Sequence, residues 1–116
     1  MKLLLDTHIP QRLMIEDRRN QVAVSVASLW EMTIKVSIGR LELLDDLVTI
    51  ENTLHLQGIP ILPIQTAHLQ SLLRLPFHHR DPFDRMIIAQ AICQEMTLVS
   101  HDTGFSAYPV SLAPLQ

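Results

Sequence analysis

The chain has 116 residues, of which 47% are apolar, 18% charged and 4% aromatic. A chain of this length and apolar content can bury a hydrophobic core, so we expect residues 1–116 to form one globular domain rather than a disordered tail. Nine Lys and Arg against twelve Asp and Glu give a net charge of −3, which argues against a protein that simply coats nucleic acid. The balance does not exclude a nucleic-acid substrate, because four acids reserved for a metal ion would leave the rest of the chain slightly basic.

The cysteine content and the length of the apolar runs indicate in which cellular compartment the protein is expected. Cys93 is the only cysteine, which excludes an internal disulfide and a CxxC zinc or redox site. No apolar run is long enough to cross a membrane, and the apolar stretch at the start is too short for a signal peptide. We therefore expect a cytoplasmic protein without a membrane partner.

Short apolar and β-branched runs predict the strands. The clearest are Lys2–Leu5, Val22–Val26 and Thr97–Ser100, and Tyr108–Leu112 is a candidate last strand. The segment Ile59–Ile64 contains Pro60 and Pro63, so a strand here is expected at an edge of the sheet.

Segments with helical periodicity lie between these runs. The first connection has room for one short helix around Pro10–Arg19. Four further helices are expected around Leu29–Ile38, Leu47–Leu56, Ala67–Leu75 and Pro82–Glu95. Strands that alternate with helices imply a mostly parallel sheet with right-handed crossovers, and hence an α/β layered domain.

Four acidic residues fall at the ends of these elements. Asp6 ends the first apolar run, and Asp102 follows the strand Thr97–Ser100 by two residues. Glu31 and Asp84 are each expected in the first turn of a helix. Because the carboxyl ends of parallel strands and the amino ends of the following helices share one edge, the topology places all four carboxylates at that edge.

Each of these acids also has a purely structural interpretation. Ser28-x-x-Glu31 has the form of a capping box, and Asp81-Pro82-x-Asp84 combines a capping residue, a first-turn proline and an acid favoured by the helix dipole. Taken singly, such motifs are more often caps than catalytic groups, and an Asp at the end of a strand is usually a turn former.

The joint arrival of four acids at one edge is harder to explain by capping. Carboxylates brought close together repel one another unless a divalent cation compensates them. Oxygen ligands favour Mg²⁺ or Mn²⁺, and the chemistry served would be phosphodiester hydrolysis. We expect Asp6, Asp84 and Asp102 to hold the metal directly or through water, and Glu31 to help orient the attacking water.

Three stretches of the chain form a recognisable pattern: LLLDTH, VSVASLWEMTIKVSIGRLEL and LPFHHRDPFDRMIIAQAICQEMTLVSHDTGFSAY. Together they resemble the PIN domain, and more closely its VapC-type toxins of bacterial type II toxin–antitoxin pairs. The resemblance implies a three-layer α/β/α fold and a metal-dependent endoribonuclease that acts on RNA. It places the family's acidic quartet on Asp6, Glu31, Asp84 and Asp102. It further implies a homodimer and an antitoxin protein whose peptide or helix blocks the acidic cleft.

The chain departs from this family in its first crossover, which is shortened between His8 and Gln21. One consequence would be an apolar patch covered by dimer contacts, or an exchange of strands between two copies. Another would be a displaced Asp6 and a loss of activity. The competing hypothesis is therefore a shortened, catalytically weak PIN-like module that dimerises and binds an antitoxin without cleaving RNA.

Several neighbours of the acids are candidates for supporting roles. Thr7 and Ser100 could hold metal-bound waters by hydrogen bonds. A cationic lip of His79, Arg80 and Arg85, together with Lys35, could contact RNA phosphates, although these side chains could also simply face solvent. Trp30 is expected in the core or in a dimer contact.

Overall fold

The computed structural model describes residues 2–6, 21–43, 45–78, 81–100 and 103–112. Within these ranges four parallel strands form one sheet in the order β3-β2-β1-β4, and their bounds are β1 Lys2–Leu5, β2 Gln21–Ser25, β3 Ile61–Leu62 and β4 Thr97–Val99. In the register, Leu5 pairs with Val24 on one side and with Val99 on the other, so the carboxyl ends of the three longer strands lie level. The mostly parallel α/β sheet predicted from the sequence is confirmed.

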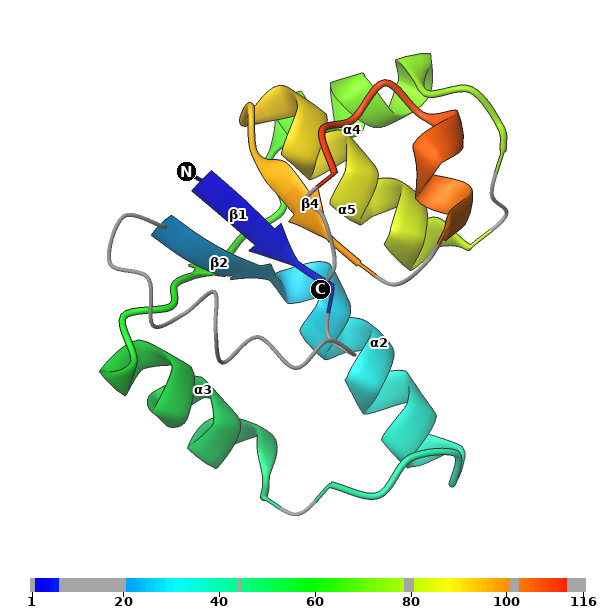
Figure 1. Ribbon diagram of the computed structural model, residues 1–116. Coiled ribbons are helices and arrows are strands. Elements are labelled where there is room, and N and C mark those ends of the chain that lie inside the picture. The colour runs from blue at the N-terminus through cyan, green and yellow to red at the C-terminus, as the bar shows by residue number, and fades with distance from the viewer. Residues whose placement is uncertain (1, 7–20, 44, 79–80, 101–102, 113–116) are drawn as a thin grey trace.

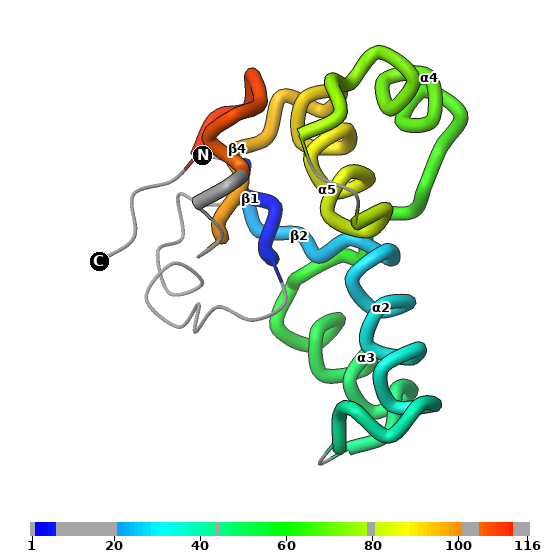
Figure 2. The backbone as a smooth tube through the Cα atoms, turned by 90° about the vertical axis from the view of Figure 1, so that its right-hand side faces the viewer, coloured from blue at the N-terminus to red at the C-terminus, as the bar shows by residue number. Residues whose placement is uncertain are grey.

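The helices divide into two groups (Figures 1 and 2). They are α2 Val26–Ser37, α3 Leu47–Leu56, α4 Thr66–Arg74, α5 Pro82–Cys93 and the short 3₁₀ helix η1 Thr103–Ala107. In both views α4 and α5 lie above, while α2 and α3 extend below the sheet. We call the sheet with α4, α5 and η1 the body, and α2 with α3 the arm.

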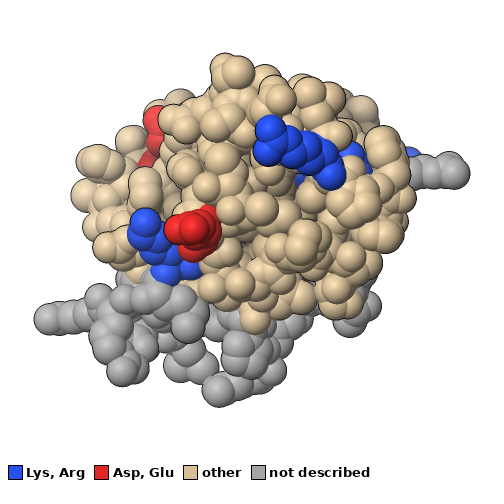
Figure 3. Space-filling view, turned by 90° about the horizontal axis from the view of Figure 1, so that it is seen from above, with Lys and Arg blue, Asp and Glu red and all other residues tan. Residues whose placement is uncertain are grey.

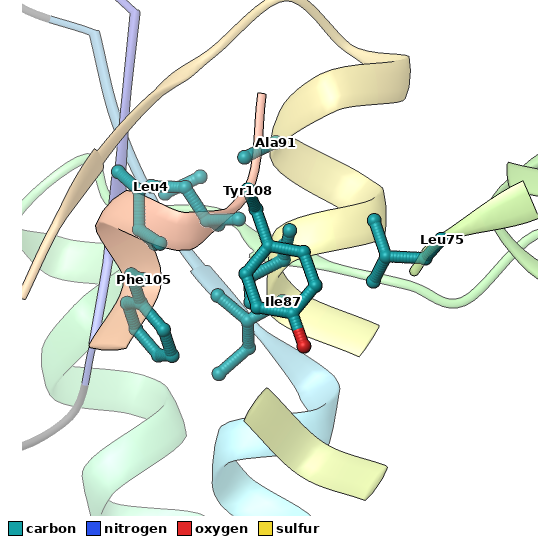
Figure 4. Close-up of a cluster of buried hydrophobic side chains, with 9 residues drawn as sticks. Leu4, Leu75, Ile87, Ala91, Phe105 and Tyr108 are labelled. Atoms are coloured by element: carbon teal, nitrogen blue, oxygen red, sulfur yellow. The ribbon is translucent and has the colours of Figure 1, made fainter. Parts of the chain in front are cut away.

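Both faces of the sheet are buried, as expected for parallel strands. On one face, strand side chains pack with α5 and η1 in a cluster of Leu4, Ala23, Leu75, Ile87, Ile88, Ala91, Leu98, Phe105 and Tyr108 (Figure 4). On the other face the cluster consists of Leu3, Leu5, Val22, Val24, Ile59 and Val99, with Leu54 of α3 packed against it. Successive residues of β1 alternate between the two clusters, which is the two-residue period of a strand.

The start of α2 differs from the sequence-based expectation. Strand β2 ends at Ser25 and α2 begins at the next residue, with the Ser25 hydroxyl accepting a hydrogen bond from the Ala27 backbone N–H at 3.0 Å. The predicted capping box of Ser28 and Glu31 is therefore wrong: Ser28 is a buried residue of the first turn, and Glu31 lies in the second turn.

Two further expectations are corrected. Trp30 is 57% exposed and therefore is not a core residue of the isolated chain. The segment Tyr108–Leu112 forms no full strand, but Leu112 makes an isolated parallel bridge to Leu98 at the β4 edge of the sheet. The short helix expected around Pro10–Arg19, and with it the shortened first crossover, lies outside the described residues. None of the helices in the described ranges has the length and apolar content needed to span a bilayer.

Candidate active site

Asp6 lies immediately after β1, at the carboxyl edge of the sheet, and is tied to the neighbouring strand. Its backbone N–H donates to the Val99 carbonyl at 2.9 Å. The Ser100 hydroxyl donates to Asp6 Oδ2 at 2.7 Å, and Ser100 itself is only 8% exposed. Ser100 therefore orients the Asp6 carboxylate directly, which is a more definite arrangement than the water-holding role that the sequence suggested.

Glu31 and Asp84 lie where α2 and α5 touch. The residues just before them, Trp30 and Phe83, form an edge-to-face aromatic pair with ring centroids 5.1 Å apart and an interplanar angle of 87°. Such a pair is a favourable contact beyond the area that it buries. Because each carboxylate follows one partner of this pair, the contact fixes the two acid-bearing turns against each other.

The beginning of α5 is defined by Asp81 and Pro82. Asp81 Oδ1 accepts hydrogen bonds from the backbone N–H groups of Phe83 at 2.8 Å and Asp84 at 3.2 Å. Pro82 occupies the first turn, where its missing N–H needs no partner. The predicted capping role of Asp81 is confirmed, and Asp84 is thereby placed in the first turn of α5, where the helix dipole favours a negative charge.

Lys35 is paired with one of the predicted catalytic acids. Its Nζ lies 3.7 Å from Glu31 Oε2, one turn further along α2, and both side chains retain some exposure. The pair places a positive charge beside Glu31 at the surface. A surface ion pair of this kind contributes little to stability.

Arg85 has a different environment from the RNA-facing position expected for it. It is only 7% exposed, and its guanidinium donates to the carbonyls of Pro76 at 3.0 Å and Leu75 at 3.4 Å. The same group lies 3.9 Å from the centre of the Phe77 ring. Arg85 thus connects α5 to the segment that follows α4 by hydrogen bonds. Because its side chain is buried, Arg85 is not positioned for the direct contact with RNA phosphates that the sequence suggested.

The remaining predicted site residues, Asp102, Thr7, His79 and Arg80, lie outside the described residues. Among the residues that the structure does describe, no three His, Cys, Asp or Glu side chains are grouped so that they could hold a metal ion. The three described acids of the predicted quartet offer oxygen donors alone. This donor chemistry fits Mg²⁺ or Mn²⁺ and does not fit a zinc site of the Cys/His type.

Sequence reasoning missed a group of buried polar side chains behind this site. Ser25, His68 and Gln90 are all fully buried and are connected to one another by polar contacts. Gln90 is the only polar residue in the otherwise apolar run Met86–Ile92, and a polar side chain in such a run is the pattern that could have revealed it.

Comparison with known proteins identifies the family. The sequence matches the PIN domain family over residues 4–110, a range that includes Asp6, Glu31, Asp84 and Asp102. The chain belongs to the PIN domain family, as its motifs indicated. PIN domains are generally nucleases that use divalent metal ions.

Solved structures agree with this assignment at the level of the fold. The chain superposes on a chain in the crystal structure of VapBC2 from Rickettsia felis, a complex bound to a DNA fragment from its promoter. The TM-score is 0.68 and the identity 17%, and the superposition covers 97% of this chain and 96% of that chain. A chain in the structure of FitAcB from Neisseria gonorrhoeae gives a TM-score of 0.59 and 19% identity with the same coverage. No curated protein sequence matches the chain significantly.

Proposed function

We propose that this protein is a divalent-metal-dependent endoribonuclease, the toxin of a type II toxin–antitoxin pair, and that it hydrolyses RNA phosphodiester bonds. The observation that supports the proposal is the position of three acids on separate elements, two of which, α2 and α5, are in contact. Asp6 follows β1 and is held to β4 by Ser100, while Glu31 and Asp84 lie at the contact between α2 and α5. Family membership supports nuclease chemistry for these acids.

In the proposed mechanism each side chain has a distinct task. Asp6, Asp84 and Asp102 would hold Mg²⁺ or Mn²⁺ directly or through water, and Thr7 and Ser100 would support them. Ser100 orients Asp6 by its hydrogen bond, and the start of α5 stabilises the charge of Asp84. The metal ion, when bound, supplies activation of water and compensation of the charge on the phosphate and the leaving oxygen.

Glu31 and the cationic residues complete the proposal. Glu31 accepts a hydrogen bond from the attacking water and so orients it toward phosphorus. Lys35, which lies beside Glu31, neutralises a phosphate of the RNA backbone, and the same task is proposed for His79 and Arg80 from their charge. Arg85 contributes indirectly, because it holds the segment that leads toward them.

The direct test is cleavage of a labelled RNA pool by the purified protein with Mg²⁺ or Mn²⁺. We expect cleavage that EDTA abolishes and that Asp84→Asn reduces by about 100-fold or more, since removing even an outer partner of a metal ligand typically costs 10–100-fold. Calorimetry should show Mn²⁺ binding to the wild-type chain and weaker binding to Asp84→Asn. The free energy of unfolding should change by less than about 1 kcal/mol, because the loss of a favourable charge at the start of α5 and the loss of repulsion between like charges oppose each other.

Glu51→Gln is the matched control for this experiment. Glu51 is an exposed acid of α3, so its variant carries the same loss of one charge and passes through the same purification. Equal cleavage by wild type, Asp84→Asn and Glu51→Gln would identify a contaminating nuclease. A wild-type chain that binds no Mn²⁺ and cuts no RNA would overturn the nuclease proposal in favour of the PIN-like module that only binds an antitoxin.

We also propose that the protein forms a homodimer through α4. Leu69 and Leu73, one turn apart on this helix, are 48% and 81% exposed, and Phe77 just beyond it is 80% exposed. The face of the molecule seen from above, on the side of α4, carries only scattered charges (Figure 3). An apolar, weakly charged surface of this kind is typical of the core of an interface between two copies.

The remaining partner is an antitoxin, proposed from the resemblance of the sequence to VapC-type toxins and from the fold shared with a chain of VapBC2. Its bound segment would cover the acidic edge and so block access of RNA. Both proteins would act in the cytoplasm. Co-expression with the antitoxin should abolish RNA cleavage while leaving the free energy of unfolding unchanged or higher.

A further inference from the structure

Gln90 lies in the centre of the body, on α5, with no exposed surface. Its Oε1 accepts a hydrogen bond from the Ser25 hydroxyl at 2.5 Å, and its Nε2 donates to the Pro63 carbonyl at 3.2 Å. The same Nε2 lies 3.4 Å from His68 Nδ1. One buried amide therefore contacts the end of β2, the segment after β3, and α4.

The orientation of the Gln90 amide is determined by its partners. His68 Nδ1 accepts a hydrogen bond from the Gln65 backbone N–H at 3.0 Å, so this nitrogen carries a lone pair and the ring proton is on Nε2. The Pro63 carbonyl is also an acceptor. Two acceptors on one side require the NH₂ group of Gln90 there, which leaves its oxygen for the Ser25 hydroxyl.

Ser25 makes two hydrogen bonds with one side-chain oxygen. It donates to Gln90 and accepts from the Ala27 backbone N–H at 3.0 Å, the bond that caps α2. Gln90 therefore fixes the direction of the capping hydroxyl. Because β2 passes into α2 without an intervening residue, it also fixes where α2 begins relative to α5.

Glu31 and Asp84 are each six residues away in sequence from one partner of the Ser25–Gln90 hydrogen bond. Ser25 precedes Glu31 by six residues on the β2–α2 segment, and Gln90 follows Asp84 by six residues on α5. The Ser25–Gln90 hydrogen bond joins the start of α2 to the last turn of α5. The Trp30–Phe83 ring contact joins the same two helices next to Glu31 and Asp84. Two points of attachment define the angle between two helices, whereas one leaves them free to pivot.

We propose that Gln90 is a positioning residue: through Ser25 it fixes the arm helix α2 against α5 and thereby sets the separation of Glu31 and Asp84. The effect on catalysis rests on the proposed nuclease function, whereas the coupling of the two helices does not. A merely structural role would predict that the loss of Gln90 lowers stability and leaves the α2–α5 contact of the folded protein unchanged.

The experiment uses Gln90→Met, which keeps the length of the side chain and removes its polar contacts with Ser25, Pro63 and His68. Trp30 is the only tryptophan of the chain, so its emission and its quenching by acrylamide report on the contact with Phe83. We expect a higher quenching constant for folded Gln90→Met than for wild type. In RNA cleavage we expect kcat to fall about 10-fold with KM nearly unchanged, the size typical of residues that orient ligands of a metal.

Matched variants separate the proposal from a general loss of stability. Gln70→Met makes the same change at an exposed position of α4 and should leave quenching and kcat at wild-type values. Ser25→Ala removes the other end of the link and should reproduce both effects of Gln90→Met, whereas Ser25→Thr keeps a hydroxyl and should restore them. The Ser25 pair decides the question if Gln90→Met does not fold.

The two proposals fail in different ways. Wild-type quenching and wild-type kcat in folded Gln90→Met, or in Ser25→Ala, would overturn the positioning role. If the wild-type chain cuts no RNA, the nuclease proposal fails, and the quenching experiment alone decides the coupling: increased quenching in Gln90→Met and Ser25→Ala supports it, and unchanged quenching overturns it.

Discussion

The body and the arm of this molecule are held together in different ways. In the body, α5 has seven consecutive buried residues, from Arg85 to Ala91, and is surrounded by the sheet, α2 and α4. In the arm, α2 buries only two residues of its first turn and α3 buries none. The body is therefore stabilised by close packing of buried side chains, whereas the arm is attached to it mainly through the first turn of α2. This difference teaches that, of the described acids of the proposed site, Asp6 and Asp84 belong to the packed body, whereas Glu31 belongs to the arm, which is held by fewer buried residues.

The largest expected effect comes from the body. Ile88 of α5 has no exposed surface and packs in the main cluster, so Ile88→Ala should lower the free energy of unfolding by about 2–5 kcal/mol. Leu56 at the end of α3 is 86% exposed, and Leu56→Ala should change it by less than about 0.5 kcal/mol. Chemical denaturation measures both, and equal effects would contradict the distinction between body and arm.

Loss of the cap of α5 should have a smaller effect. Asp81→Ala removes the hydrogen bonds to the backbone of Phe83 and Asp84, and should cost about 1 kcal/mol of unfolding free energy. Asp81→Asn keeps a capping oxygen and should recover most of it. If both variants lost the same stability, the negative charge and not the hydrogen bonds would be responsible.

The body should also become less stable in mild acid. Burial lowers the pKa of His68 below its usual value of 6.5, so the unfolded chain binds a proton more readily than the folded one. Stability is therefore complete above about pH 6.5 and falls as the pH decreases through the unfolded value. Unfolding between pH 7.5 and 5.5 should show a steeper loss for wild type than for His68→Gln, with the exposed His55→Gln as the matched control.

In the arm, the corresponding pH effect is local and occurs at lower pH. The Asp46 carboxylate accepts the Thr49 backbone N–H at 2.8 Å, and hydrogen bonds from Thr49 hold the pKa of Asp46 below its usual value. The cap is thus present above that value and is lost as the pH falls through the folded pKa. In wild type, the protection of the Thr49 amide against hydrogen exchange should decrease as the pH falls. In Asp46→Asn, which has no carboxylate to protonate, this protection should depend less on pH. Asp45→Asn, which changes the neighbouring exposed acid, should behave like wild type.

The smallest effect on stability is expected on the exposed side of the body. Leu73→Ser should change the unfolding free energy of the monomer by less than about 0.5 kcal/mol, because the side chain is 81% exposed. If α4 forms the proposed homodimer interface, the same variant should shift the protein toward monomers in light scattering. Leu56→Ser, equally exposed on the arm, should leave the oligomeric state unchanged.

Much of the fold follows from local patterns in the sequence. The alternation of apolar runs and helical segments predicted the parallel sheet, and the Asp81-Pro82 pair predicted the start of α5. These features depend on neighbours along the chain, since strand periodicity and capping act over a few residues. The cap of α2 could not be found in this way. Ser25 and Ser28 are both suitable capping residues, and the choice of Ser25 coincides with its hydrogen bond to Gln90, 65 positions away in sequence.

The candidate site was predictable to a similar extent. Parallel topology placed Asp6 at the carboxyl edge of the sheet, and the Asp81-Pro82 pair placed Asp84 in the first turn of α5, whereas Glu31 lies one turn later in α2 than expected. These patterns did not reveal that Arg85 is turned inward onto the Leu75 and Pro76 carbonyls. Charge alone suggests a surface role for an arginine, and only the packing of α5 against the segment after α4 decides otherwise.

The direct passage from β2 into α2 has a consequence for changes in chain length. One residue inserted between Ser25 and Val26 would advance the helix by about 100° around its axis, because an α-helix has 3.6 residues per turn. The indole of Trp30 would swing off Phe83, and the acid after it would face a new direction. An insertion at this junction should therefore change the direction of every side chain on α2, whereas the same insertion in the loop between α2 and α3 should leave the start of α2 in place.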